Sequence, residues 1–118
     1  MRWLVLLVAA CTDPQGVSSG STCPPAPVTY ADFGQTFFQS YCLECHSTTK
    51  TGTARQSAPV TIDFDTQALV RMHTSNIDRL AAFGPDAKNT QMPVAGKPKP
   101  SNEERELLGE YIACEVGR

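Results

Sequence analysis

Five consecutive residues near the middle of the chain, Cys42-Leu43-Glu44-Cys45-His46, bring two thiols and an imidazole into one turn of backbone. The C-x-x-C-H spacing is the attachment signature of c-type haem. Cysteines three positions apart can reach the two vinyl groups on one edge of a porphyrin, and the adjacent histidine then turns its ring toward the iron. We therefore expect Cys42 and Cys45 to bind haem covalently and His46 to be an axial iron ligand.

Two other kinds of chemistry use a C-x-x-C pair. A thioredoxin-like redox pair belongs to a βαβ context, whereas this motif is expected at the end of a helix and the start of a loop. A zinc site needs a second pair of ligands at matched spacing, and neither Cys23 nor Cys114 belongs to such a pair. The motif favours haem over both alternatives.

Helices at the two ends of the folded region are expected to position this motif. The first is predicted before Cys42, where Thr29 to Asp32 has the form of a capping box. The last is predicted after Ser101, where Ser101 to Glu104 forms a second capping box with acidic residues in the first turn. Each helix carries one apolar face, made up of Phe33, Phe37, Phe38 and Tyr41 in the first and of Leu107, Leu108, Tyr111 and Ile112 in the last.

A middle helix is predicted from about residue 65 or 66 to Phe83, with Gly84 and Pro85 as its stop signal. Thr74-Ser75-Asn76 can divide it into two shorter helices. Met72 has the spacing of a core residue on this helix.

On these residues, the stretch from Tyr30 to Arg118 resembles the small monohaem class I cytochromes c. The resemblance implies an all-α, cytochrome c-like fold, in which three to four short helices and loops wrap around one covalently bound haem c. It also implies that the first and last helices cross, with Gly34 at the crossing.

A six-coordinate haem iron needs a second axial ligand, and the candidates are Met92, Met72 and His73. The resemblance implies Met92, which precedes Pro93 in a loop rich in proline and glycine before the last helix. A neutral thioether favours ferrous iron and raises the reduction potential. His73 is the alternative ligand and would lower that potential.

The resemblance also suggests two residues around the haem. In the family, the proximal histidine donates its second ring N–H to a proline carbonyl in the following loop, which fixes the ring. Pro59 is the candidate for that carbonyl. Arg55 in the same loop could hydrogen-bond a haem propionate, although an exposed loop arginine is the favoured interpretation.

The N-terminus predicts export and lipid attachment. Arg2 is followed by an apolar stretch over residues 3–10, too short for a membrane span of about 20 residues but typical of a secretory signal. The ending at Cys11 resembles the bacterial lipobox, in which that cysteine is acylated and anchors the protein; a buried strand ending in Cys11 is the alternative. We expect a signal peptide over 1–10, a lipidated cysteine and flexible tether over 11–28, and a cytochrome c domain over 29–118. The expected location is the periplasm, with Thr12 favouring the outer membrane.

Two of the five cysteines are left after these assignments, Cys23 and Cys114. An even remainder in an oxidising compartment predicts a disulfide, and the resemblance supports it because the first and last helices cross. Two free thiols are the alternative.

Net charge and hydrophobic content further limit the functions that this chain can have. A net charge of −2 without a basic cluster excludes nucleic acid as a partner. The hydrophobic share of 41% is low, so haem is expected to complete the core. We predict a one-electron carrier, not an enzyme, with redox proteins as partners, a lipid membrane as anchor and no small-molecule substrate. The alternatives are a small haem catalyst or gas sensor with an open sixth position, and a non-haem module using Cys42 and Cys45 as a redox pair.

Overall fold

Short helices joined by long loops make up the part of the chain that the structure describes. The structure is a computed structural model and describes residues 16–116 and 118. Across these residues there is no β-strand, and one isolated antiparallel bridge joins Phe83 to Lys88. The elements are a π-helical turn η1 (Tyr30–Gly34), α1 (Gln35–Tyr41), a 3₁₀ turn η2 (Gly52–Arg55), α2 (Gln67–Arg71), α3 (Thr74–Ala81) and α4 (Asn102–Glu115).

The first helical segment begins where the sequence predicts it. Thr29 caps η1, since its Oγ1 accepts the Asp32 N–H at 3.1 Å. The segment continues without a break into α1, and Phe37 and Phe38 are both buried in the core. Neighbouring aromatic rings then lie 5.1 to 5.6 Å apart along this face, in the pairs Phe33–Phe37, Phe37–Phe38 and Phe37–Tyr41.

The last helix is capped by the predicted box. Ser101 Oγ accepts the Glu104 N–H at 3.1 Å, and Glu104 Oε1 accepts the Ser101 N–H at 3.0 Å. The buried face of α4 includes Leu108, Tyr111 and Ile112, as the periodicity predicts. The two capping bonds satisfy backbone donors that a helix start would otherwise leave unpaired.

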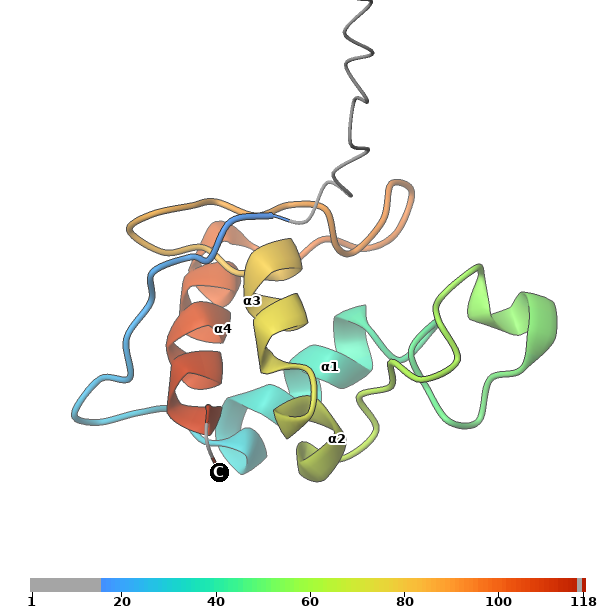
Figure 1. Cartoon of the computed structure of the whole chain (residues 1–118), viewed down its shortest axis with the longest axis horizontal. Coiled ribbons are helices and arrows are strands. Elements are labelled where there is room, and N and C mark those ends of the chain that lie inside the picture. The colour runs from blue at the N-terminus through green and yellow to red at the C-terminus, as the bar shows by residue number, and fades with distance from the viewer. Residues whose placement is uncertain (1–15, 117) are drawn as a thin grey trace, which may run out of the picture.

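The η1–α1 segment crosses α4 at Gly34. A Cβ at this position would lie 2.9 Å from Tyr111 Cζ, so a larger residue would push the two helices apart. The Phe33 and Tyr111 rings meet edge to face, with centroids 6.1 Å apart. Figure 1 shows α3 and α4 side by side, with η1 and α1 crossing them near one end.

The middle helix is divided in two, slightly before the predicted position. Thr66 caps α2 by accepting the Leu69 N–H at 3.2 Å, and the break falls at Met72 and His73. The break turns Met72 to the surface, where it is 72% exposed, so the prediction of a core methionine is wrong. The second helix, α3, ends at Ala81 rather than Phe83.

Residues 16–22, which we call the strap, pack against the domain instead of forming the predicted flexible tether. The Asp78 carboxylate accepts the Ser19 N–H at 3.0 Å and the hydroxyls of Ser18 and Ser19. Ser19 is fully buried, and its carbonyl accepts the Asp86 N–H at 2.9 Å. Composition misled the prediction because small side chains allow close packing as well as disorder: a Cβ on Gly84 would lie 2.4 Å from the Ser19 carbonyl oxygen.

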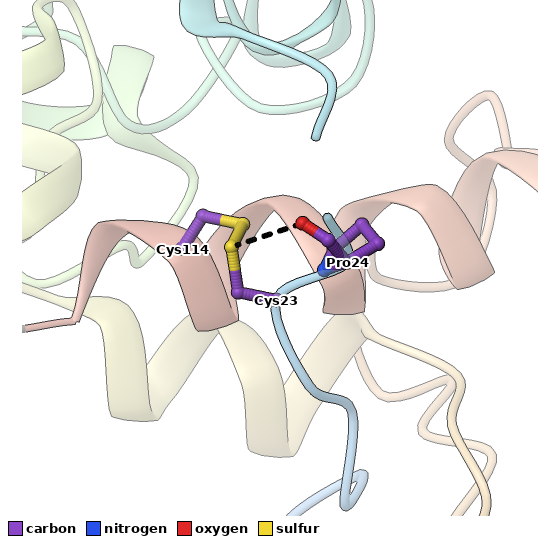
Figure 2. The surroundings of a disulfide bond; sticks show 3 residues. All are labelled: Cys23, Pro24 and Cys114. Carbon is purple, nitrogen blue, oxygen red and sulfur yellow. Dashed lines mark hydrogen bonds between the residues drawn. A yellow bond between two sulfur atoms is a disulfide. The ribbon is translucent and has the colours of Figure 1, made fainter. Parts of the chain in front are cut away.

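A disulfide fastens the chain directly after the strap. Cys23 is bonded to Cys114 near the end of α4, with Cα atoms 4.7 Å apart, and the two residues are 91 positions apart in the sequence (Figure 2). This is the predicted pair, so the alternative of two free thiols is wrong.

The predicted signal peptide and Cys11 lie outside the described residues. Within residues 16–116 and 118, no helix is both long enough and apolar enough to cross a membrane.

Candidate functional site

An apolar crevice of about 160 Å³ opens between the helices and the two long loops, residues 42–66 and 82–101. Its walls come from α1, α3 and α4 and from segments around residues 59–64 and 92–93. Most lining side chains are aromatic or aliphatic, among them Phe37, Phe64, Ile77, Leu80 and Leu108. A neighbouring hollow of about 180 Å³ shares Cys42, His46 and Met92 with the crevice and adds Cys45. The two candidate thiols, His46 and Met92 thus line two adjoining hollows, of which the first is the more apolar.

The C-x-x-C-H motif folds as a turn directly after α1. The carbonyl of Cys42 accepts the N–H groups of Cys45 at 3.3 Å and His46 at 2.9 Å. Both cysteines are free thiols in the structure. The prediction that the motif ends a helix and enters a loop is confirmed.

Burial raises the pKa of the Cys42 thiol to about 12. A thiol with so high a pKa is protonated near neutral pH, and thiol–disulfide exchange requires the thiolate. The burial of Cys42 therefore disfavours its use as the attacking thiolate of a thioredoxin-like pair.

The His46 ring is held in one orientation. Its Nδ1 donates a hydrogen bond to the Ile62 carbonyl at 2.8 Å, which leaves Nε2 as the free lone pair. The ring also packs on Phe64, with centroids 5.0 Å apart. Burial lowers the pKa of His46, which favours the neutral imidazole that metals bind.

Ile62, not Pro59, supplies the carbonyl, so that prediction is wrong by three residues. Pro59 lines the crevice, but its carbonyl accepts from Arg55 Nη2 at 2.6 Å. The loop backbone explains the shift. Gln56 and Ser57 adopt left-handed conformations, and a turn closed by the Ile62 N–H on the Pro59 carbonyl at 3.1 Å then brings Ile62 to the ring.

Arg55 is neither the exposed loop residue nor the free propionate ligand that the sequence suggested. It is 4% exposed, and its guanidinium forms an ion pair with Asp63 at 2.8 Å. Its remaining N–H groups donate to backbone carbonyls of the same loop, those of Ser47, Lys50, Ala58 and Pro59. Since these protein acceptors use its donors, Arg55 holds the loop behind His46 together.

Met92 lines the crevice together with His46. Its N–H donates to the Leu80 carbonyl at 2.9 Å, and its own carbonyl accepts from Arg105 Nη1 at 2.9 Å. Residues 92–100 form no helix, as predicted. The backbone of Met92 is thus held on both sides.

His73 itself does not line the crevice in the described part of the chain, but it contacts Phe64, which does. It is the N-terminal flanking residue of α3 and packs edge to face on Phe64, with centroids 6.0 Å apart. Its Nε2 is buried and has no hydrogen-bond partner among the described residues. The geometry favours Met92 over His73 as a second ligand from the crevice wall.

Two contributors to the site were missed at the sequence level. The Ile62 carbonyl is a backbone group and carries no side-chain signal. Arg105 does carry one, because it lies three and seven positions before Leu108 and Ile112, on the buried face of α4.

The residues present fit a c-type haem. They offer two thiols on one turn, an oriented neutral imidazole and a thioether on the wall of one apolar space. Within residues 16–116 and 118, no group of three or more His, Cys, Asp or Glu side chains is arranged to hold a metal ion. The chain matches no family model, no curated protein and no solved structure.

Proposed function

We propose that this protein is a one-electron carrier with one covalently attached haem c and a cytochrome c-like fold. The observation that carries the proposal is that His46 and Met92 line one apolar crevice, with Cys42 and Cys45 beside them. The crevice and the neighbouring hollow each combine a cysteine thiol with the His46 imidazole and the Met92 thioether.

Four side chains would hold the group: Cys42 and Cys45 through thioether bonds, and His46 and Met92 through Nε2 and the sulfur. Haem, when bound, supplies an iron that gains or loses one electron. The protein orients His46 through the Ile62 carbonyl and excludes water with the apolar wall. An apolar crevice wall that excludes water and a neutral sulfur ligand would both favour the less charged ferrous state, which raises the reduction potential.

The proposal includes export to the periplasm and a lipid anchor on Cys11, with redox proteins as partners. Four residues, 12–15, separate Cys11 from the strap, and the five Cα–Cα steps from Cys11 to Gly16 span at most about 18 Å. Because the strap is packed on the domain, the domain could not move as far from the membrane as a free tether over residues 11–28 would allow. No small-molecule substrate is part of the proposal.

Expression with a cytochrome maturation system tests the proposal. We expect a pyridine haemochrome spectrum of a haem with two thioether bonds, and no binding of carbon monoxide by the ferrous protein. Ready binding of carbon monoxide would favour the catalyst or gas sensor with an open sixth position. Absence of covalent haem would contradict both and favour the dithiol module.

A further inference from the structure

Arg105 is a charged residue within the apolar face of α4. It is 3% exposed and lies on the same face as Leu108 and Ile112. Among the described residues it forms no ion pair. Placing a cation in such a position is costly unless hydrogen bonds compensate it, so its contacts indicate what it does.

The Arg105 Nη1 group donates to three backbone carbonyls. They belong to Ala81 at 2.9 Å, Asn89 at 3.2 Å and Met92 at 2.9 Å. Ala81 ends α3, and the other two belong to the segment that leads to the crevice. One side chain thereby ties the end of α3 to the backbone of Met92.

The neighbouring contacts fasten the same connection. The Arg105 carbonyl accepts the Phe83 N–H at 3.1 Å, and the guanidinium lies over the Phe83 ring, 5.6 Å from its centroid. The Met92 N–H is bonded to the Leu80 carbonyl at 2.9 Å. With both backbone groups of Met92 engaged, the freedom that remains to this residue is in its side chain.

We propose that Arg105 is a positioning residue for Met92, holding its carbonyl so that the thioether stays on the crevice wall. The inference rests on the proposed function and names the group that keeps the second axial ligand in place. A guanidinium suits the task, because it stays charged when buried and its Nη1 carries two N–H donors that the three converging carbonyls can share. A neutral side chain of the same length would leave those carbonyls buried without a donor.

The test compares Arg105→Met and Arg105→Lys with Arg79→Met, a matched control on the exposed face of α3. The first readout is amide hydrogen exchange, by mass spectrometry, in the peptide covering residues 87–98. We expect exchange at least tenfold faster in Arg105→Met, since the segment loses its shared donor, and within twofold of wild type in Arg79→Met.

The second readout is the affinity of the ferric holoprotein for added imidazole, which competes with Met92 for the iron. We expect at least tenfold tighter binding in Arg105→Met and unchanged binding in Arg79→Met. Circular dichroism and haem content confirm that the variants compared are folded and loaded. Wild-type exchange and wild-type imidazole affinity in a folded Arg105→Met protein would overturn the proposal.

Arg105→Lys decides the question if Arg105→Met does not fold. Lysine keeps the charge and has three N–H donors, but its nitrogen lies one bond short of the position of Nη1, so it cannot reach all three carbonyls unless the segment moves. We expect exchange at least threefold faster than in wild type, and an unchanged rate would contradict the positioning role. If the wild-type protein carries no covalent haem, the proposed function fails, while exchange in the same preparation still decides whether Arg105 holds the segment.

Discussion

The two long loops that flank the crevice are each organised by one buried arginine, and the two arginines differ in charge balance. On the His46 side, Arg55 donates hydrogen bonds to the loop carbonyls and also forms an ion pair with the Asp63 carboxylate at 2.8 Å. On the Met92 side, Arg105 donates hydrogen bonds to three carbonyls and forms no ion pair with any described residue.

The two loops differ in what is required of them, because each would hold a different candidate iron ligand. Under the proposed function, the ring of His46 would have to be fixed, and the Ile62 carbonyl that orients it belongs to the loop that the Arg55–Asp63 pair stabilises. Under the proposed function, Met92 would bind the iron through a weak iron–sulfur bond, so the protein itself would have to hold its loop in place. Burial lowers the pKa of Arg105, which is the electrostatic cost of that arrangement, although an arginine stays charged at neutral pH.

Removing Arg55 should produce the largest loss of stability. Arg55→Met leaves Asp63 buried without its cation, which typically costs about 3–5 kcal/mol. Urea unfolding of the holoprotein measures the loss, and Arg79→Met should stay within about 0.5 kcal/mol of wild type. A double variant with Asp63→Leu should recover part of the loss, because no unpaired charge then remains. No loss in Arg55→Met would contradict a structural role for the pair.

Arg105→Met should cost less free energy of unfolding than Arg55→Met, about 1–3 kcal/mol. It leaves carbonyls without a donor but removes a cation that had no counter-charge. The same urea experiment orders the two variants. If Arg105→Met proves the more destabilising of the two, the contrast between a neutralised and an unpaired arginine is not what distinguishes the loops.

A smaller effect should depend on pH and stay on the His46 side. Burial acts to raise the pKa of Asp65, but hydrogen bonds from the Ser47 hydroxyl and the Thr48 N–H outweigh it, so the pKa lies below its ordinary value. A carboxylate of this kind stabilises the fold above its unfolded pKa of about 3.9, and the contribution is lost as the pH falls through the lower folded value.

Asp65→Asn should therefore lower the free energy of unfolding by about 1 kcal/mol at pH 7, and by nothing measurable once the pH lies below the folded pKa. Unfolding curves of both proteins at several pH values measure this. A difference that is independent of pH would show that the charge of Asp65 is not involved.

Met72→Ala should have the smallest effect, within about 0.5 kcal/mol, because its side chain is exposed. A loss of several kcal/mol would indicate that Met72 is buried in the folded protein.

Local sequence signals predicted much of this molecule. Capping residues at Thr29 and Ser101 act within one turn, so the starts of the first and last helices could be predicted. The disulfide could be predicted from the even number of remaining cysteines, with support from the helix crossing that the family resemblance implies. Such features depend on neighbours in the sequence or on a small number of possible pairings.

The failures concern choices made by tertiary contacts. Which carbonyl meets His46 depends on left-handed residues and a turn in the loop, and Pro59 could not be told from Ile62 by residue type. The strap was predicted to be flexible because it is rich in small and polar residues. Its composition does not indicate that Asp78, about 60 positions later, binds it. Arg105 lies on an apolar face of α4. Its three acceptors are backbone carbonyls from distant parts of the sequence, so residue types alone could not predict these hydrogen bonds.

The most direct test of the central claim is the long-wavelength charge-transfer band of the ferric holoprotein, which reports an iron–methionine sulfur bond. We expect the band in wild type and in Met72→Ala, and its loss in Met92→Ala, with a reduction potential lower by roughly 0.1 V or more within the ~0.8 V range that axial ligands control. A Met92→Ala protein with covalent haem, an unchanged band and an unchanged potential would contradict the pairing of His46 with Met92 across the crevice.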